Sequence, residues 1–130
     1  MPPMKRFALL FLTACLAPAA AAAGSGLAIA GRGATLEQVL SAPHPADYRL
    51  LIRSRELERI AAPEARDEVL DLLGRARRGG AVLFACEKDL RARHLRPTDL
   101  PPGVVALAAS HVWESGASTP ADRLLREICS

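Results

Sequence analysis

Short apolar runs alternate along the chain with longer charged segments. Three runs, Tyr48–Ile52, Ala81–Ala85 and Val104–Ala108, have the length and apolar character of buried strands. A fourth candidate, Leu27–Ala30, lies in a region rich in Gly and Ala, where a flexible lead-in is an equally good interpretation. The pattern predicts a small sheet made of short strands.

The clearest helix is predicted over Glu64–Arg78. Pro63 suits its first position, and acidic residues in the first turn and arginines in the last suit the helix dipole. Apolar residues recur along one face, at Ala65, Val69, Leu72, Leu73 and Ala76. Gly79 and Gly80 then end the helix. Because this helix lies between two strand candidates, we expect a right-handed βαβ unit with parallel strands.

Three shorter helices complete the pattern. Thr35–Leu40 starts with a capping-box spacing, Lys88–His94 follows the second apolar run, and Thr119 caps a last helix. The apolar face of that last helix is expected at Ala121, Leu124, Leu125 and Ile128. The charged segment 53–59 is expected only to end the strand before it. The order of elements predicts an α/β fold, a small three-layer sandwich with a mostly parallel sheet.

Residues 1–23 have the pattern of a secretory signal peptide. Lys5 and Arg6 are basic, Phe7–Leu16 is apolar, and small residues, for instance Ala21 and Ala23, suit a cleavage site. The apolar run is short for a bilayer span. We therefore expect a signal peptide over 1–23, a single domain over 24–130, and a periplasmic or secreted protein.

A second processing route involves Cys15. The segment Leu12–Cys15 resembles a bacterial lipobox, in which Cys15 would become the lipidated first residue. The sequence after Cys15 stays apolar, so we favour cleavage near Ala23. Membrane association is expected only if Cys15 is lipidated.

The net charge excludes one class of partner. The chain carries +3, and Lys5 and Arg6 account for two of these charges, so the predicted mature domain carries only +1. Charges of both signs are interspersed, without the basic surface typical of nucleic-acid binding. No His, Cys or Asp spacing resembles a zinc site, and we expect no cofactor.

Cys86 is the main candidate for chemistry. It follows the apolar run 81–85, at the edge of a parallel sheet where ligands commonly bind, and a helix is expected directly after it. Lys88 and Arg91 favour a thiolate, whereas Glu87 and Asp89 oppose one. The opposing interpretation is a small buried hydrophobic residue.

Cys129, in the last predicted helix, is the second cysteine of the predicted mature domain. In an oxidising compartment it is a disulfide partner of Cys86, a resolving thiol, or unpaired. A Cys86–Cys129 bridge would stabilise the fold by about 3–4 kcal/mol. His111 is a further candidate partner of Cys86, because it precedes Val112-Trp113 and is expected near the ends of the strands.

The segment 79–110 resembles the central part of the DsrE/DsrF-like sulfur-relay family. The motif comprises Ala85-Cys86, Leu90, Arg91, an acidic loop at Thr98–Leu100 and Pro102-Gly103-Val104. The resemblance extends over Tyr48 to about Ser110. It implies an α/β sandwich that commonly oligomerises, and it makes Cys86 the position that carries sulfur as a persulfide.

Two functions follow from the sequence. In the first, the protein is an exported sulfur carrier or sulfurtransferase, with Cys86 as the persulfide acceptor, Arg91 and His111 as binding residues, and a thiol or persulfide protein as partner. In the second, it is a non-catalytic binding or interaction module with structural cysteines. Exposed sheet edges favour a homo-oligomer in either case.

Overall fold

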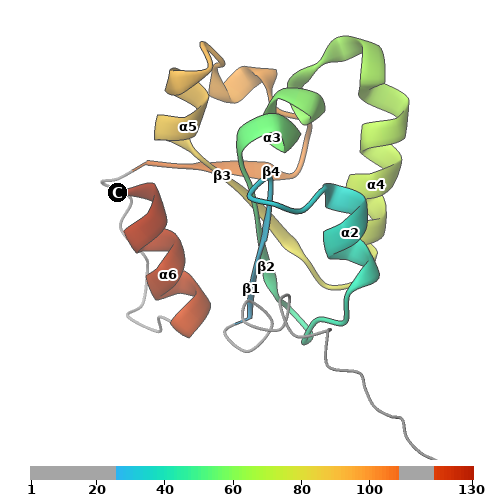
Figure 1. Cartoon of the computed structure of the whole chain (residues 1–130), viewed down its shortest axis with the longest axis vertical. Helices are drawn as coiled ribbons and strands as arrows, with labels where there is room; N and C mark the ends of the chain where they lie inside the picture. The colour runs from blue at the N-terminus through green and yellow to red at the C-terminus, as the bar shows by residue number, and fades with distance from the viewer. Residues whose placement is uncertain (1–25, 109–118) are drawn as a thin grey trace, which may run out of the picture.

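The computed structural model describes residues 26–108 and 119–130. The predicted signal peptide, Cys15 and His111 lie outside these ranges. Four strands form one sheet, β1 (Leu27–Ala30), β2 (Arg49–Ile52), β3 (Val82–Cys86) and β4 (Val104–Leu107). They are adjacent in chain order, and each neighbouring pair is parallel. The prediction of an α/β sandwich is confirmed, and the described sheet is parallel throughout (Figure 1).

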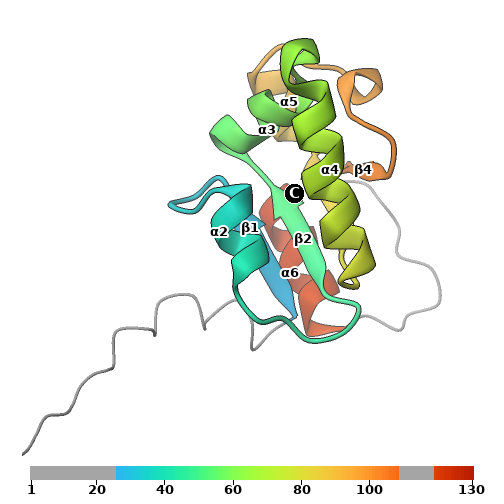
Figure 2. The ribbon, with the colours of Figure 1, turned by 90° about the vertical axis from the view of Figure 1, so that its right-hand side faces the viewer.

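The helices form two unequal layers on the sheet. One face carries α2 (Leu36–Ser41), α3 (Ser54–Ala61), α4 (Arg66–Arg78) and α5 (Glu87–Ala92), and the other carries α6 (Pro120–Cys129) (Figures 1 and 2). Parallel strands joined in consecutive order by right-handed crossovers place every connecting helix on the same side. The opposite side is therefore not covered by the connections between the strands, and among the described residues α6 covers it. We call the two sides the crossover face and the α6 face.

A large apolar core fills the crossover face. Its strand residues alternate with those of the opposite face, as the pleat requires. The most deeply buried members come from three strands and four helices: Ala30, Leu36, Leu50, Ile52, Leu57, Val69, Leu73, Ala76, Leu83, Ala85 and Leu90. This core fixes the carboxyl ends of the strands relative to the helices that come after them.

A smaller core lies beneath α6. The sheet contributes Leu27, Leu51, Phe84, Cys86 and Leu107, and α6 contributes Ala121, Leu125 and Cys129. The helix starts as predicted, with Thr119 and Asp122 forming a capping box and Pro120 in the first turn. Its buried face is shifted from the predicted one, because 121, 125 and 129 point inward and Leu124 is exposed.

Two other expectations are wrong in detail. The charged segment after β2 forms α3, in which Leu57 and Ile60 are buried against the crossover face. The helix expected over Glu64–Arg78 begins with a 3-10 turn at Pro63–Ala65, and its α-helical part starts at Arg66. Leu57 and Ile60 are the main apolar residues of this short, highly charged segment. Two apolar positions were too weak a pattern to predict a helix.

Candidate functional site: the Cys86–Cys129 bridge

Cys86 occupies the junction between β3 and α5. It was expected just beyond the strand, but it is the last strand residue, in register with Leu107 of β4, and it is also the N-cap of α5. The helix begins directly at Glu87, one residue earlier than predicted. The side chain points to the α6 face and is 0% exposed.

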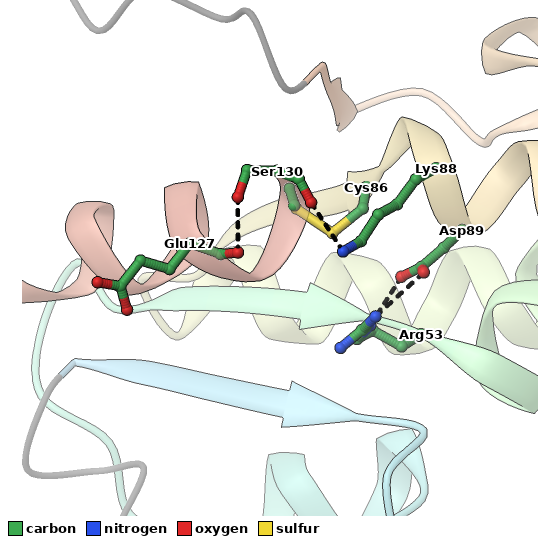
Figure 3. Close-up of a disulfide and its surroundings, with 7 residues drawn as sticks. Arg53, Cys86, Lys88, Asp89, Glu127 and Ser130 are labelled. Atoms are coloured by element: carbon green, nitrogen blue, oxygen red, sulfur yellow. Dashed lines mark hydrogen bonds and ion pairs between the residues drawn. A yellow bond between two sulfur atoms is a disulfide. The ribbon is translucent and has the colours of Figure 1, made fainter.

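Cys86 is bonded to Cys129 in the structure. The two Cα atoms are 5.0 Å apart, within the range that a disulfide requires, and the residues are 43 positions apart in sequence (Figure 3). Cys129 lies in the last turn of α6 and is 3% exposed. Of the fates considered for Cys129, the structure contains the disulfide, so in this state Cys86 carries no free thiol.

A buried ion pair lies next to the bridge. Arg53, the residue after β2, donates to both carboxylate oxygens of Asp89, from Nε at 2.7 Å and from Nη2 at 3.1 Å (Figure 3). Both side chains are largely buried. The hydrogen bond to Asp89 raises the pKa of Arg53, and the fixed bidentate geometry is typical of strong pairs. The negative charge of Asp89, which was expected to oppose a thiolate at Cys86, is therefore balanced within the protein.

The other charged residues of α5 separate into two groups. Lys88 extends toward the end of α6, where Nζ donates to the Ser130 O atom at 3.0 Å (Figure 3). Arg91 lies on the outer surface, with its side chain 72% exposed, and its guanidinium is 3.7 Å from the Glu87 carboxylate. The structure thus places Lys88 between α5 and the end of α6. Arg91 as a binding residue stays a prediction.

Arg53 is the site residue that the sequence analysis missed. The sequence does contain a pattern that could have indicated Arg53. Arg53 directly follows β2, and Cys86 is the last residue of β3. Neighbouring parallel strands bring their carboxyl ends to the same edge of the sheet, so residues at those two ends are expected to be close. Asp89 in the first turn of α5 then supplies the complementary charge.

The four described strands show no order reversal that would open a ligand crevice at their carboxyl ends. A crevice forms where successive crossovers leave on opposite faces, whereas here they share one face. A shallow hollow does lie at the ends of β1 and β2, lined by the 31–35 loop and the start of α3. The Leu36 N–H at the start of α2 donates to the Glu56 carboxylate at 2.9 Å. The Leu36 amide at the start of α2 therefore already has a hydrogen-bond partner within the chain, the Glu56 carboxylate.

The described residues offer little for other kinds of site. Across 26–108 and 119–130, no group of three or more His, Cys, Asp or Glu side chains is arranged to hold a metal ion. Within the same ranges, no helix combines the length and apolar character that a bilayer span needs. The candidate site therefore consists of the bridged cysteines with Lys88, Arg53 and Asp89.

Comparison with known proteins adds no relative. The chain matches no protein-family model, no curated protein and no solved structure. The similarity to the DsrE/DsrF-like family stays a prediction that depends on the segment around Cys86.

Proposed function

We propose that this protein handles sulfur through Cys86, and that the Cys86–Cys129 bridge is its oxidised state. The observation that carries the proposal is the position of the bridge, which joins the carboxyl end of β3 to the last turn of α6. Opening the bridge would release a thiol at the motif position that the DsrE/DsrF-like resemblance assigns to the persulfide. The dithiol is the form that accepts sulfur.

Sulfur transfer to the opened site needs no metal or cofactor. A thiol reductant first exchanges twice with the bridge, leaving Cys86 and Cys129 as thiols and the reductant as its disulfide. The Cys86 thiolate then attacks the outer sulfur of a persulfide donor, R–S–SH. A new S–S bond forms on Cys86, the donor's S–S bond breaks, and R–S⁻ leaves.

The surroundings of Cys86 support a thiolate. Lys88 places a positive charge in the first turn of α5, and Asp89 is neutralised by its bidentate pair with Arg53. Glu87 is the remaining acidic neighbour in the sequence, and it faces Arg91 at 3.7 Å. These contacts remove much of the electrostatic opposition that the sequence suggested.

The proposal includes export. A signal peptide over 1–23 would deliver the protein to the periplasm or the cell exterior, where disulfides form and persist. The partner is a thiol or persulfide protein, and neither nucleic acid nor a bound cofactor is expected. The edge strands β1 and β4 of the described sheet favour self-association.

A persulfide assay tests the proposal. The purified protein is reduced, freed of reductant and incubated with glutathione persulfide, and its peptides are mapped by mass spectrometry. We expect a gain of about 32 mass units, one sulfur atom, on the peptide Gly79–Lys88, which contains Cys86. The Cys86→Ser variant should lose this gain and Cys129→Ser should keep it. A reduced protein with a reactive Cys86 thiol but no added sulfur would refute the carrier function.

The second candidate is a binding or interaction module with a structural disulfide. The burial of both cysteines, 0% and 3% exposed, favours it. A structural bridge is expected to have a reduction potential below about −300 mV and to resist glutathione, whereas a functional bridge should be more oxidising. Equilibration in glutathione redox buffers separates the two candidates.

A further inference from the structure

We infer that the bridge opens at Cys129: an incoming thiolate attacks the Cys129 sulfur, and Cys86 leaves as the thiolate. The inference rests on the proposed function, because Cys86 must be released before it accepts sulfur. It assigns different roles to the two cysteines, with Cys129 as the point of attack and Cys86 as the released group.

The first argument concerns access to each sulfur. Cys129 is in the last turn of α6, next to exposed Ser130, and helix ends open locally more readily than the middle of an element. Cys86 is fixed between β4, through its register with Leu107, and α5, of which it is the N-cap. A nucleophile reaches Cys129 when one helical turn opens. It reaches Cys86 only if the carboxyl end of β3 separates from β4 and α5.

The contacts along α6 direct the opening to that end. At the first turn, Asp122 pairs with Arg49 at 3.3 Å and closes the capping box, and Leu125 is fully buried in the middle of the helix. At the last turn, exposed hydrogen bonds link Ser130 to Glu127 and to Lys88, at 2.9 and 3.0 Å. Apart from the bridge itself, the last turn is therefore held by weaker contacts than the first turn.

The second argument concerns the leaving group. A thiol of lower pKa leaves faster in disulfide exchange. A Cys86 thiolate would form at the N-cap of α5, where the free N–H groups favour negative charge and Asp89 is already paired to Arg53. A Cys129 thiolate would form at the carboxyl end of ten-residue α6, where the helix dipole disfavours negative charge. Access and leaving-group stability thus select the same direction.

The exchange is balanced without a further oxidant or reductant. The attacking sulfur of R–S⁻ bonds to the Cys129 sulfur, and the bond between the Cys129 and Cys86 sulfurs breaks. The electron pair of that bond leaves with Cys86. The products are the mixed disulfide R–S–S–Cys129 and the Cys86 thiolate, and the total number of S–S bonds is unchanged.

Trapping the first product tests the direction. The oxidised full-length protein is mixed with excess glutathione and quenched with acid at short times, and the released thiol is then alkylated with N-ethylmaleimide under acidic conditions, before the bridge can close again. Trypsin then separates the two cysteines, since one is in Gly79–Lys88 and the other in the peptide that begins at Glu127. We expect glutathione on Cys129 and the alkyl group on Cys86, in an excess on the order of tenfold over the reverse product. Equal amounts, or an excess of glutathione on Cys86, would overturn the inference.

A matched pair of serine variants tests the access route. Ser130→Ala removes the hydroxyl bond to Glu127 O in the last turn of α6, and Ser41→Ala removes the equivalent 2.9 Å bond to Glu37 O in the last turn of α2. Ser130→Ala should open the bridge about two- to fivefold faster, and Ser41→Ala should leave the rate unchanged. Equal opening rates in Ser130→Ala and wild type contradict the inference.

The failures of the two proposals are distinguishable. The trapping experiment contains no sulfane donor, so its product ratio is independent of persulfide formation. Reversed mapping overturns the direction of opening and leaves the carrier function standing. Correct mapping without sulfur uptake on Cys86 overturns the carrier function alone. A bridge that glutathione does not open at all overturns both and favours the structural module.

Discussion

The crossover face of the sheet is covered by four helices that lie between successive strands in the sequence, whereas among the residues that the structure describes the α6 face is covered by one helix. On the crossover face the strand residues are buried along most of the sheet. On the α6 face, Val82 at the start of β3 and Val105 in β4 remain 40% and 44% exposed. The disulfide lies on this sparsely covered face.

The difference shows how topology decides where a covalent link is useful. Consecutive parallel order supplies the crossover face with helices automatically, and these bury a core large enough to hold them. In the described part of the chain, only α6 covers the opposite face. A ten-residue helix with three inward apolar positions buries little surface, so the bridge at its end supplies attachment that packing alone provides on the other face.

Equivalent leucine deletions on the two faces should give the largest effects. Leu73→Ala in α4 and Leu125→Ala in α6 each remove a fully buried side chain, and each should lower the free energy of unfolding by about 2–5 kcal/mol in the oxidised protein. After reduction, the Leu73 effect should persist and the Leu125 effect should become much smaller, because α6 is then weakly attached. Urea unfolding with and without reductant measures both. An equal loss for Leu125→Ala in both redox states would show that packing holds α6.

Removal of the bridge should have the next largest effect. Cys86→Ala with Cys129→Ala should lower the free energy of unfolding by about 3–4 kcal/mol, given the 43-residue separation. Amide hydrogen exchange should become faster in α6 before it changes in α4, since the bridge attaches only α6. Uniform acceleration over both helices would contradict the distinction between the faces.

The smallest effect should come from an ion pair on the crossover face. Glu37 of α2 accepts a hydrogen bond from Arg59 of α3 at 2.7 Å, and this bond is the main reason that the pKa of Glu37 falls from 4.5 to about 2. A lowered folded-state pKa stabilises the protein fully above about pH 4.5, and that contribution is lost as the pH falls toward 2. Because Glu37 is half-exposed, Glu37→Gln should cost less than about 1 kcal/mol at pH 7.

Unfolding curves of wild type and Glu37→Gln from pH 7 to pH 2 check this effect. The difference between them should shrink through the range 4.5 to 2, with little effect on the attachment of α6. A double-mutant cycle with Arg59→Gln isolates the pair, because Arg59 also contacts Glu56 at 3.0 Å. A difference that is constant with pH would rule out the ion pair as its cause.

Most of the fold was accessible from the sequence. Apolar runs located the strands, and the capping residues Thr35 and Thr119 located two helix starts to the residue. The segment 54–61 was missed because Leu57 and Ile60 are its main apolar positions among charged residues, and its helix depends on the core that it covers. Local pattern also could not show that Leu124 faces outward while Cys129 faces inward.

The site was accessible only in part. The position of Cys86 at a strand end could be inferred from the apolar run before it, but its bond to Cys129 depends on how α6 returns across the sheet. The Arg53–Asp89 pair depends on the register of β2 and β3 and on the start of α5 at Glu87. These are tertiary relations. The chemistry of single residues indicates Cys86, Cys129 and Asp89, whereas Arg53 and the pairings follow from the fold.

The consecutive strand order also has a consequence for the order of folding. Each strand of the sheet pairs with the next strand in the sequence, and a single crossover connects the two. These contacts are therefore comparatively close in sequence and should form early. Helix α6 instead packs against β1, Leu27–Ala30, and these two are the described elements farthest apart in the sequence. Oxidation of Cys129 then reports the last step of assembly: a bridged molecule is one in which the final helix has reached the sheet.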